Sequence, residues 1–325
     1  MLAVALLSFA PRLLQAQTFE PAAPRLFAFS QDGAGLPTNL DPVAATQPAA
    51  TSRPVDAHGA KHPEESSAER GDFPTPAGST GLEEFVNHFA PHEPIYFIAG
   101  WESPAVRFQL SGRYRIFSPG GELATKYPFV KGFNLAYTQT SLWDVSKPSA
   151  PFFDSSYRPE FFYYLENVRL AGMAPNAQLG GILGVGHESN GKDGADSRSL
   201  NIAYIRPILS TPLGSHDWFV TFAPKLYIYI GDLSDNPDIK RYRGFADLRL
   251  VVGQRDGLQL AAIGRIGDHF DRASGQFDLT YPLTKLFRGN VDLCLDAQYF
   301  IGYGESLLTY KQYDSVFRIG VNVVR

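Results

Sequence analysis

The sequence has few of the features that mark a disulfide-linked, metal-cluster or helical membrane protein. Cys294 is the single cysteine among 325 residues, which excludes an intrachain disulfide and any zinc or iron–sulfur site built from several cysteines. The sequence contains no run of about 18 or more apolar residues, the length that a membrane-spanning helix requires. The 33 acidic and 29 basic residues leave a formal charge of −4, so no basic excess indicates nucleic-acid binding.

Aromatic and chain-bending residues, by contrast, are abundant. The chain has 24 Phe and 16 Tyr, and its aromatic share of 13% favours strands over helices. Thirty Gly and 24 Pro provide many turn positions. The composition therefore leaves two classes, a soluble β-rich protein or a membrane β-barrel, in which only alternate residues of each strand face lipid.

The chain divides into three segments. Residues 1–17 hold an apolar stretch from Leu2 to Ala10 and small residues near Ala16, which predicts a secretory signal peptide, with a buried terminal helix as the alternative. Residues 18–84 are rich in Pro, Ala, Ser and Thr. Such a segment cannot bury enough apolar surface to offset its ordering entropy, so we predict a disordered linker. Residues 85–325 form the predicted folded domain.

The folded domain has alternating apolar and polar residues. From Val106 to Phe117 the even positions are mostly apolar, whereas the odd positions up to Arg115 carry Arg, Gln, Ser, Arg and Arg. Residues 245–252, 291–300 and 316–323 also alternate, and aromatic residues typical of membrane girdles lie near strand ends (Trp101, Phe117, Tyr229, Tyr299). At roughly 20 residues per tilted strand and turn, the domain allows about 12 strands. We therefore predict an all-β protein, an antiparallel transmembrane β-barrel preceded by a disordered N-terminal segment.

The residues with catalytic potential lie between Gly184 and Asn201. His187 and Ser189 are two apart, so on a strand they share one face, and an imidazole beside a hydroxyl is the minimum for an activated serine nucleophile. Asn201 could orient the histidine if residues 190–198 form a turn and Asn201 lies beside His187 on the next antiparallel strand. The alternative is an ordinary strand end and turn, since His-x-Ser is a short motif that often matches by chance.

The turn offers oxygen ligands. Lys192, Asp193, Asp196 and Ser197 supply carbonyl, carboxylate and hydroxyl oxygens, which suit a hard cation such as Ca²⁺.

A longer set of motifs resembles one known family. His187-Glu188-Ser189-Asn190-Gly191, followed by Ser197-Arg198-Ser199 and Asn201, resembles the signature of the outer-membrane phospholipase A family. The resemblance continues in matching order to the C-terminus through these motifs: Tyr137-Thr138-Gln139 with Trp143, Pro151-Phe152, Tyr157-x-Pro159, Asp235-Asn236-Pro237-Asp238-Ile239, Tyr281-Pro282-x-Thr284-Lys285 and Gly302-Tyr303-Gly304-Glu305-Ser306-Leu307.

The resemblance implies a twelve-stranded barrel of the bacterial outer membrane. Members of that family are calcium-dependent serine hydrolases that cleave acyl esters of phospholipids and become active as homodimers. Expected partners are therefore the phospholipid substrate, outer-membrane lipid and a second copy of the chain, and not nucleic acid.

The same resemblance assigns roles to individual residues. Ser189 is the expected nucleophile, His187 the general base and acid, and Asn201 the orienting residue. Gly191 is the candidate for a backbone oxyanion donor. The expected calcium ligands are the Lys192 carbonyl and Ser197 of one subunit, with the Ser149 carbonyl supplied by the partner subunit; Gln139 corresponds to a glutamine of the dimer interface.

Two other functions remain as alternatives. A non-catalytic porin or structural barrel would conduct ions, whereas the enzyme interpretation expects a lumen crowded by charged residues (Arg107, Arg113, Arg115, Asp247, Arg249). A soluble, secreted β-sandwich esterase would be extracted without detergent. His88 and His92 have the spacing of helical zinc ligands, but Pro91 interrupts a helix, so we expect exposed histidines before the first strand. His58 and His62 lie in the predicted linker.

Overall fold

A computed structural model describes residues 87–174, 176–214 and 217–325. The predicted signal peptide (1–17) and the predicted linker (18–84) lie outside these residues and remain predictions. Strands make up most of the described chain. None of its helices is long and apolar enough to cross a membrane.

The strands run in chain order almost from the first described residue to the last. They are β1 (Phe89–Ala90), β2 (Ile95–Gly100), β3 (Val106–Arg115), β4 (Phe133–Trp143), β5 (Phe152–Val168), β6 (Gln178–Ser189), β7 (Ser199–Pro212), β8 (Trp218–Phe222), β9 (Lys225–Ile230), β10 (Ala246–Gln254), β11 (Gln259–Ile266), β12 (Ala273–Pro282), β13 (Cys294–Tyr303) and β14 (Tyr313–Val324).

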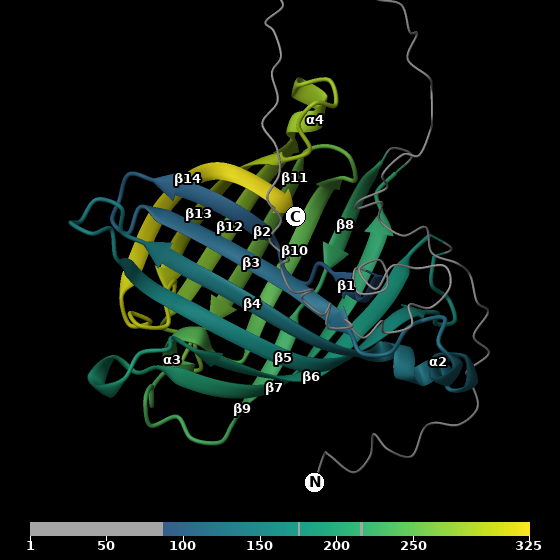
Figure 1. Ribbon diagram of the computed structural model, residues 1–325, viewed down its shortest axis with the longest axis horizontal. Coiled ribbons are helices and arrows are strands. Elements are labelled where there is room, and N and C mark those ends of the chain that lie inside the picture. Colours follow the sequence, from purple (N-terminus) through teal and green to yellow (C-terminus); the bar gives the residue numbers. More distant parts are fainter. Residues whose placement is uncertain (1–86, 175, 215–216) are drawn as a thin grey trace, which may run out of the picture. The chain divides into compact units, whose positions relative to one another are not determined.

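These strands close into a barrel of twelve antiparallel positions (Figure 1). Strands β8 and β9 share one position, because both pair with β7 and with β10 in one continuous register and are separated only by Ala223 and Pro224. Pro224 has no N–H to donate to the ladder, which accounts for the break. The two-residue β1 pairs with β3 outside this count, and β2 closes the barrel by pairing with β14 and β3. The predicted fold class is confirmed.

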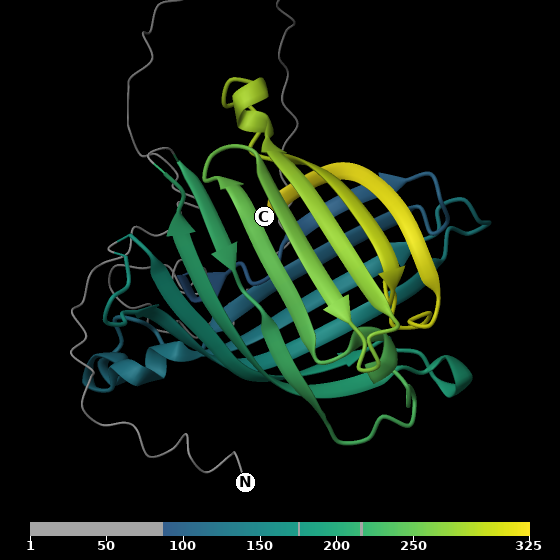
Figure 2. The same ribbon diagram turned by 180° about the vertical axis from the view of Figure 1, so that it is seen from behind.

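The connections divide between the two ends of the barrel. Because all pairings are antiparallel, the β4–β5, β6–β7, β9–β10 and β13–β14 connections lie at one end, called the site end below. The short helices η2 (Gly194–Asp196) and α3 (Lys240–Arg243) belong to that end. At the opposite end lie α2 (Glu122–Lys126), η1 (Pro128–Gly132) and α4 (Leu283–Leu286), and Figure 2 shows α3 and α4 at opposite ends of the wall formed by β10 to β12.

Side chains alternate between the outside and the lumen as the sequence predicts. In β3, Leu110 is 54% exposed, whereas Arg107 is 8% exposed and donates to Gln298 of β13 across the lumen. The predicted strand at 291–300 begins three residues later, at Cys294. Tyr229, expected in an outer girdle, instead packs in the lumen against a buried aromatic cluster.

The segment before β2 turns into the lumen. The Glu93 carboxylate pairs with Arg206 of β7 at 2.7 Å and with Arg249 of β10 at 3.2 Å. His92 Nε2 lies 2.7 Å from Glu160 Oε2 of β5. Residues 91–94 therefore tie three strands together inside the barrel.

The expectation of exposed histidines was consequently wrong. His88 is 8% exposed and bonds to Ser118 Oγ at 2.8 Å, and the His92 side chain is 4% exposed and stacks on Phe162. Their spacing in sequence carried no sign of this burial, because the segment is irregular and its partners lie 30 and 68 residues away.

Candidate active site

The hairpin of β6 and β7 carries all three residues of the predicted triad. Its register places His187 opposite Asn201 and Ser189 opposite Ser199. On β6 the odd positions Leu183 and Val185 are exposed, and on β7 the odd position Ile205 is exposed. By alternation, the three predicted catalytic side chains lie on the outer wall of the barrel, near its site end.

One hydrogen bond defines the geometry of the pair. His187 Nδ1 donates to Asn201 Oδ1 at 2.8 Å. An amide oxygen only accepts, so this bond places the proton of the neutral imidazole on Nδ1 and leaves the Nε2 lone pair free. The turn required by the sequence interpretation is present: residues 190–198 connect the two strands, and Asn201 lies beside His187.

Ser189 lies two residues from His187 on the same face of β6. Within the described residues its Oγ has no hydrogen bond to His187. Catalytic hydrogen bonds are often completed only when substrate is bound, and both groups project from the same stretch of strand.

Asn190 organises the turn that follows the serine, a role that sequence reasoning missed. Its side chain is buried, with Oδ1 accepting from Arg198 N at 3.0 Å and Nδ2 donating to Asp196 O at 2.9 Å. An asparagine followed by glycine was the available signal, since Asn side chains commonly bond to nearby backbone in turns.

Gly191 needs to be glycine on two counts. Its φ is +66°, in the left-handed region, and a Cβ at this position would approach Tyr157 Cε2 to 2.9 Å. The backbone at this candidate oxyanion donor is thus fixed by the turn and by its neighbour on β5.

The β9–β10 connection supports the hairpin from the side. Asn236, fully buried, accepts from Ser199 N at 3.0 Å, and Asp235 Oδ2 accepts from Ser197 Oγ at 2.9 Å and from Ser199 Oγ at 3.1 Å. Asp235 and Asn236 belong to one of the motifs that resemble the family. Their partners in the hairpin lie more than 35 positions away in the sequence, so no local pattern predicts these contacts.

Asp238 anchors this connection at its other end. It accepts from Tyr310 and pairs with Lys311 at 2.8 Å. Although burial disfavours its ionised form, Lys311 and Tyr310 hold the pKa of Asp238 below its usual value. The supporting connection is therefore tied to the β13–β14 connection by a charged residue that stays ionised at neutral pH.

The residues expected to hold calcium lie in site-end connections. Lys192 and Ser197 belong to the β6–β7 turn, and Ser149, with φ +65°, lies in the β4–β5 connection. The donor set is all oxygen. Ser197 Oγ donates its proton to the Asp235 carboxylate, which leaves its lone pairs to face a cation, and the carboxylate adds negative charge. The Lys192 ammonium is directed elsewhere, to Phe153 O at 3.0 Å. These residues fit a hard cation.

Gln139 lies on β4, at an outward position of the wall next to β5. Its Oε1 accepts from Tyr137 OH and its Nε2 donates to Ser141 Oγ, each at 3.2 Å. A polar strip of Tyr137, Gln139 and Ser141 therefore runs along an outer face that is otherwise mostly apolar.

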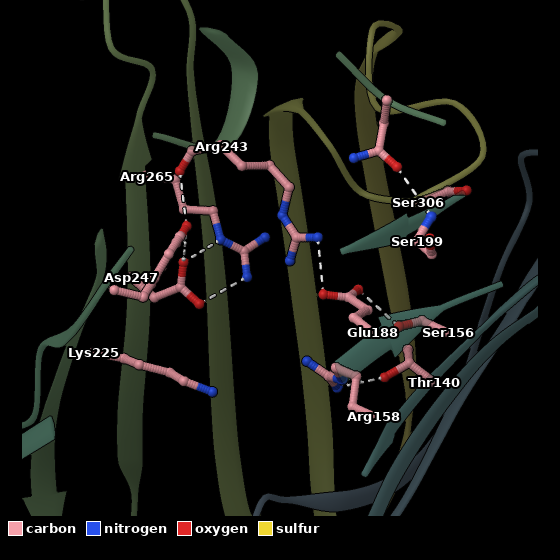
Figure 3. A network of polar contacts seen from close by, with 12 residues as sticks. Thr140, Ser156, Arg158, Glu188, Ser199, Lys225, Arg243, Asp247, Arg265 and Ser306 are labelled. Atoms are coloured by element: carbon pink, nitrogen blue, oxygen red, sulfur yellow. Dashed lines mark hydrogen bonds and ion pairs between the residues drawn. The ribbon is translucent and has the colours of Figure 1, made fainter. Parts of the chain in front are cut away.

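Between the two catalytic candidates of β6, Glu188 points the opposite way, into the lumen. Its carboxylate accepts from Arg243 of α3 at 3.0 Å and from Ser156 Oγ of β5 at 2.7 Å (Figure 3). Burial opposes the charge of the guanidinium, yet the Glu188 carboxylate holds the pKa of Arg243 above its usual value.

Comparisons with known sequences identify the family. The sequence model of the phospholipase A1 family matches residues 89–323. Phospholipase A1 of Klebsiella pneumoniae is 29% identical over 266 residues, which cover 75% of this chain and 85% of that protein. Phospholipase A1 of Escherichia coli K12 is 30% identical over 213 residues, covering 62% of this chain and 68% of that protein.

Solved structures give the same result. Outer membrane phospholipase A from Escherichia coli superposes with a TM-score of 0.58 at 25% identity, covering 73% of this chain and 98% of that one. The Salmonella typhi outer membrane phospholipase, described as a dimer with bound calcium, superposes with a TM-score of 0.59 at 26% identity, covering 73% and 92%.

Proposed function

This chain belongs to the phospholipase A1 family, and from that premise we propose that it hydrolyses acyl esters of glycerophospholipids through Ser189, His187 and Asn201. It is a bacterial outer-membrane β-barrel, as its relatives and its twelve-position barrel indicate. The proposal covers both acyl positions, the A1 and A2 bonds, and lysophospholipids. The observation that carries it is the 2.8 Å bond from His187 to Asn201, two residues from an outward-facing serine.

In the proposed reaction, Ser189 Oγ attacks the ester carbonyl while His187 Nε2 takes its proton. Asn201 keeps the imidazole in the required tautomer and orientation, without the charge that a carboxylate orienter would add. His187 then gives the proton to the leaving lysolipid oxygen. Water then attacks the acyl-enzyme with His187 again as base, and His187 returns the proton to Ser189 Oγ as the fatty acid leaves.

The Gly191 N–H is the proposed donor to the oxyanion, since the turn holds it in place beside Ser189. Lys192 O and Ser197 Oγ are the proposed calcium ligands of this subunit, and Ser149 O of a partner subunit completes the set. Bound calcium would supply Lewis-acid stabilisation of the developing negative charge. The homologous Salmonella structure is a dimer with bound calcium, which supports this part of the proposal.

Dimerisation is proposed as the activating event. A polar side chain such as Gln139 on a lipid-facing wall gains most by pairing across a two-fold axis, where its amide leaves the hydrocarbon environment. With a calcium ligand supplied by each subunit, a complete site would form only in the dimer.

The outward position of the triad suits the substrate. An ester at the headgroup boundary of a membrane is reached from the outer wall and not from the lumen, so the site end is proposed to lie at the outer leaflet.

The test is fatty-acid release from mixed phospholipid–detergent micelles. We expect Ser189→Ala to lower the rate by at least about 1,000-fold, because the nucleophile is lost, and EDTA to abolish activity until calcium is restored. Ser315→Ala is the matched control, since Ser315 is an exposed serine on β14, far from the hairpin in the strand order. Unchanged activity in Ser189→Ala or in EDTA would contradict the mechanism.

A further inference from the structure

The ladder between β5 and β6 has a gap beside the triad. Tyr157 pairs with Ser189 and Glu160 pairs with Gly186, but Arg158 and Pro159, which face Glu188 and His187 in that register, make no pair. Pro159 has no N–H to donate, which explains the gap. On the other side the ladder to β7 is complete from Gln178 to Ser189. His187 and Glu188 of β6 are therefore paired on the β7 side only.

The side chain of Glu188 crosses this gap on the lumen face. Its Oε1 accepts from Ser156 Oγ of β5 at 2.7 Å, and its Oε2 accepts from Arg243 Nη1 at 3.0 Å (Figure 3). Both side chains of the ion pair are nearly buried, with exposures of 12% for Glu188 and 11% for Arg243. A charge-assisted bond in such surroundings is stronger than an exposed one.

The two partners connect Glu188 to different parts of the site. Ser156 precedes Tyr157, which faces Ser189 and contacts the position of Gly191. Arg243 ends α3, in the same β9–β10 connection whose Asp235 and Asn236 hold the turn. One carboxylate thus joins β5, β6 and this supporting connection directly behind the residues proposed to react.

We propose that Glu188 is a positioning residue: with Ser156 and Arg243 it bridges the two-residue gap in the β5–β6 ladder and fixes the backbone that carries His187 and Ser189. Glu188 touches no substrate, since it faces the lumen. Its effect is on the alignment of His187 and Ser189, and misplacement of reacting groups by about 1 Å can cost about 100-fold in rate. This inference rests on the proposed serine mechanism.

The experiment compares purified full-length variants in mixed micelles. Glu188→Gln keeps the shape of the side chain but removes the charge opposite Arg243. We expect kcat, and the rate of fluorophosphonate labelling of Ser189, to fall roughly 10- to 100-fold, with KM within about twofold because the outer binding surface is unchanged. Glu93→Gln is the matched control, because it also removes a lumen carboxylate between arginines, but its partner on β7, Arg206, lies opposite Ile182, five residues before His187 on β6.

A second pair of variants keeps the ion pair intact. Ser156→Ala removes the bond that bridges the gap and should lower kcat roughly 3- to 10-fold, whereas Ser156→Thr retains the hydroxyl and should restore kcat. Heat-modified gel mobility confirms that each barrel is folded. If Glu188→Gln does not fold, the comparison of Ser156→Ala with Ser156→Thr tests the positioning role.

The outcomes separate the two proposals. A folded Glu188→Gln protein with wild-type kcat, or a Ser156→Thr variant no more active than Ser156→Ala, overturns the positioning role while the serine mechanism stands. If the wild-type protein neither releases fatty acid nor takes the label, both the serine mechanism and the positioning role of Glu188 are contradicted.

Discussion

The two faces of β6 differ sharply in what surrounds them. Outward, His187 and Ser189 project from the barrel wall, and among the described residues the side-chain hydrogen bond between them and another strand is that of His187 with Asn201. Inward, the Glu188 carboxylate is held by Arg243 and Ser156 (Figure 3), and a second buried group in the lumen pairs Glu160 with Lys225 and His92. Adjacent residues of one strand therefore serve different purposes: the outer ones are free to meet a substrate, and the inner one is immobilised.

This division suits a barrel enzyme. A reacting face that must contact lipid cannot be packed tightly by its own chain, so rigidity has to come from the other side of the sheet. In the lumen, buried charges are paired across strands, which ties distant parts of the wall together. The comparison predicts that outward changes alter catalysis and that most lumen changes alter stability.

Among the tests of the contrast between the two faces, the largest effect is expected on the outer face, at Asn201. Asn201→Ala removes the acceptor for His187 Nδ1, so the imidazole loses its fixed tautomer and orientation. We expect kcat to fall roughly 10- to 100-fold, less than for loss of the nucleophile, because an amide orienter adds no charge. Steady-state hydrolysis in micelles measures it, and Asn201→Asp should recover part of the rate. Wild-type activity in Asn201→Ala would break the assignment.

Removal of a carboxylate in the lumen, by contrast, should leave kcat unchanged and lower the stability of the barrel. Glu93→Gln leaves Arg206 and Arg249 without their shared counter-charge, which should lower the free energy of unfolding by about 3 kcal/mol or more. The measurement is denaturant unfolding in detergent, with kcat expected within twofold of wild type. A large fall in kcat with unchanged stability would show that the two faces are not separable in this way.

The smallest signal is expected from the conductance of the wild-type barrel in planar bilayers, which should be low. Arg107, Arg249 and Asp247 face the lumen and are paired there, and residues 91–94 cross it. Single-channel recording gives the conductance. Steady porin-like currents would favour the passive-barrel alternative and would show that the lumen contacts do not fill the pore.

The sequence predicted those parts of the molecule that depend on local periodicity. Alternation identified the strands and their faces, and the role proposed for Asn201 required a turn over residues 190–198 with Asn201 beside His187, which the register confirms. The roles of the three residues, and of Ser149, Lys192, Ser197 and Gly191, remain proposals.

Contacts between distant segments could not be predicted in the same way. The buried position of His92 depends on Glu160 of β5, and the Glu188–Arg243 pair joins residues 55 apart. Tyr229 faces the lumen because the exposed residues Leu226, Ile228 and Ile230 take the outer positions of β9, and its packing partners lie on other strands of the barrel. Such features follow from closure of the barrel.

The central claim is that the hydroxyl of Ser189 is activated by His187 and Asn201. It is tested most directly by treating the purified protein with a fluorophosphonate and mapping the modified residue by mass spectrometry. We expect label on Ser189, absent in Ser189→Ala and slowed in Asn201→Ala, with Ser315 unmodified. A protein that takes no label at Ser189, or takes it equally at Ser315, would contradict the account.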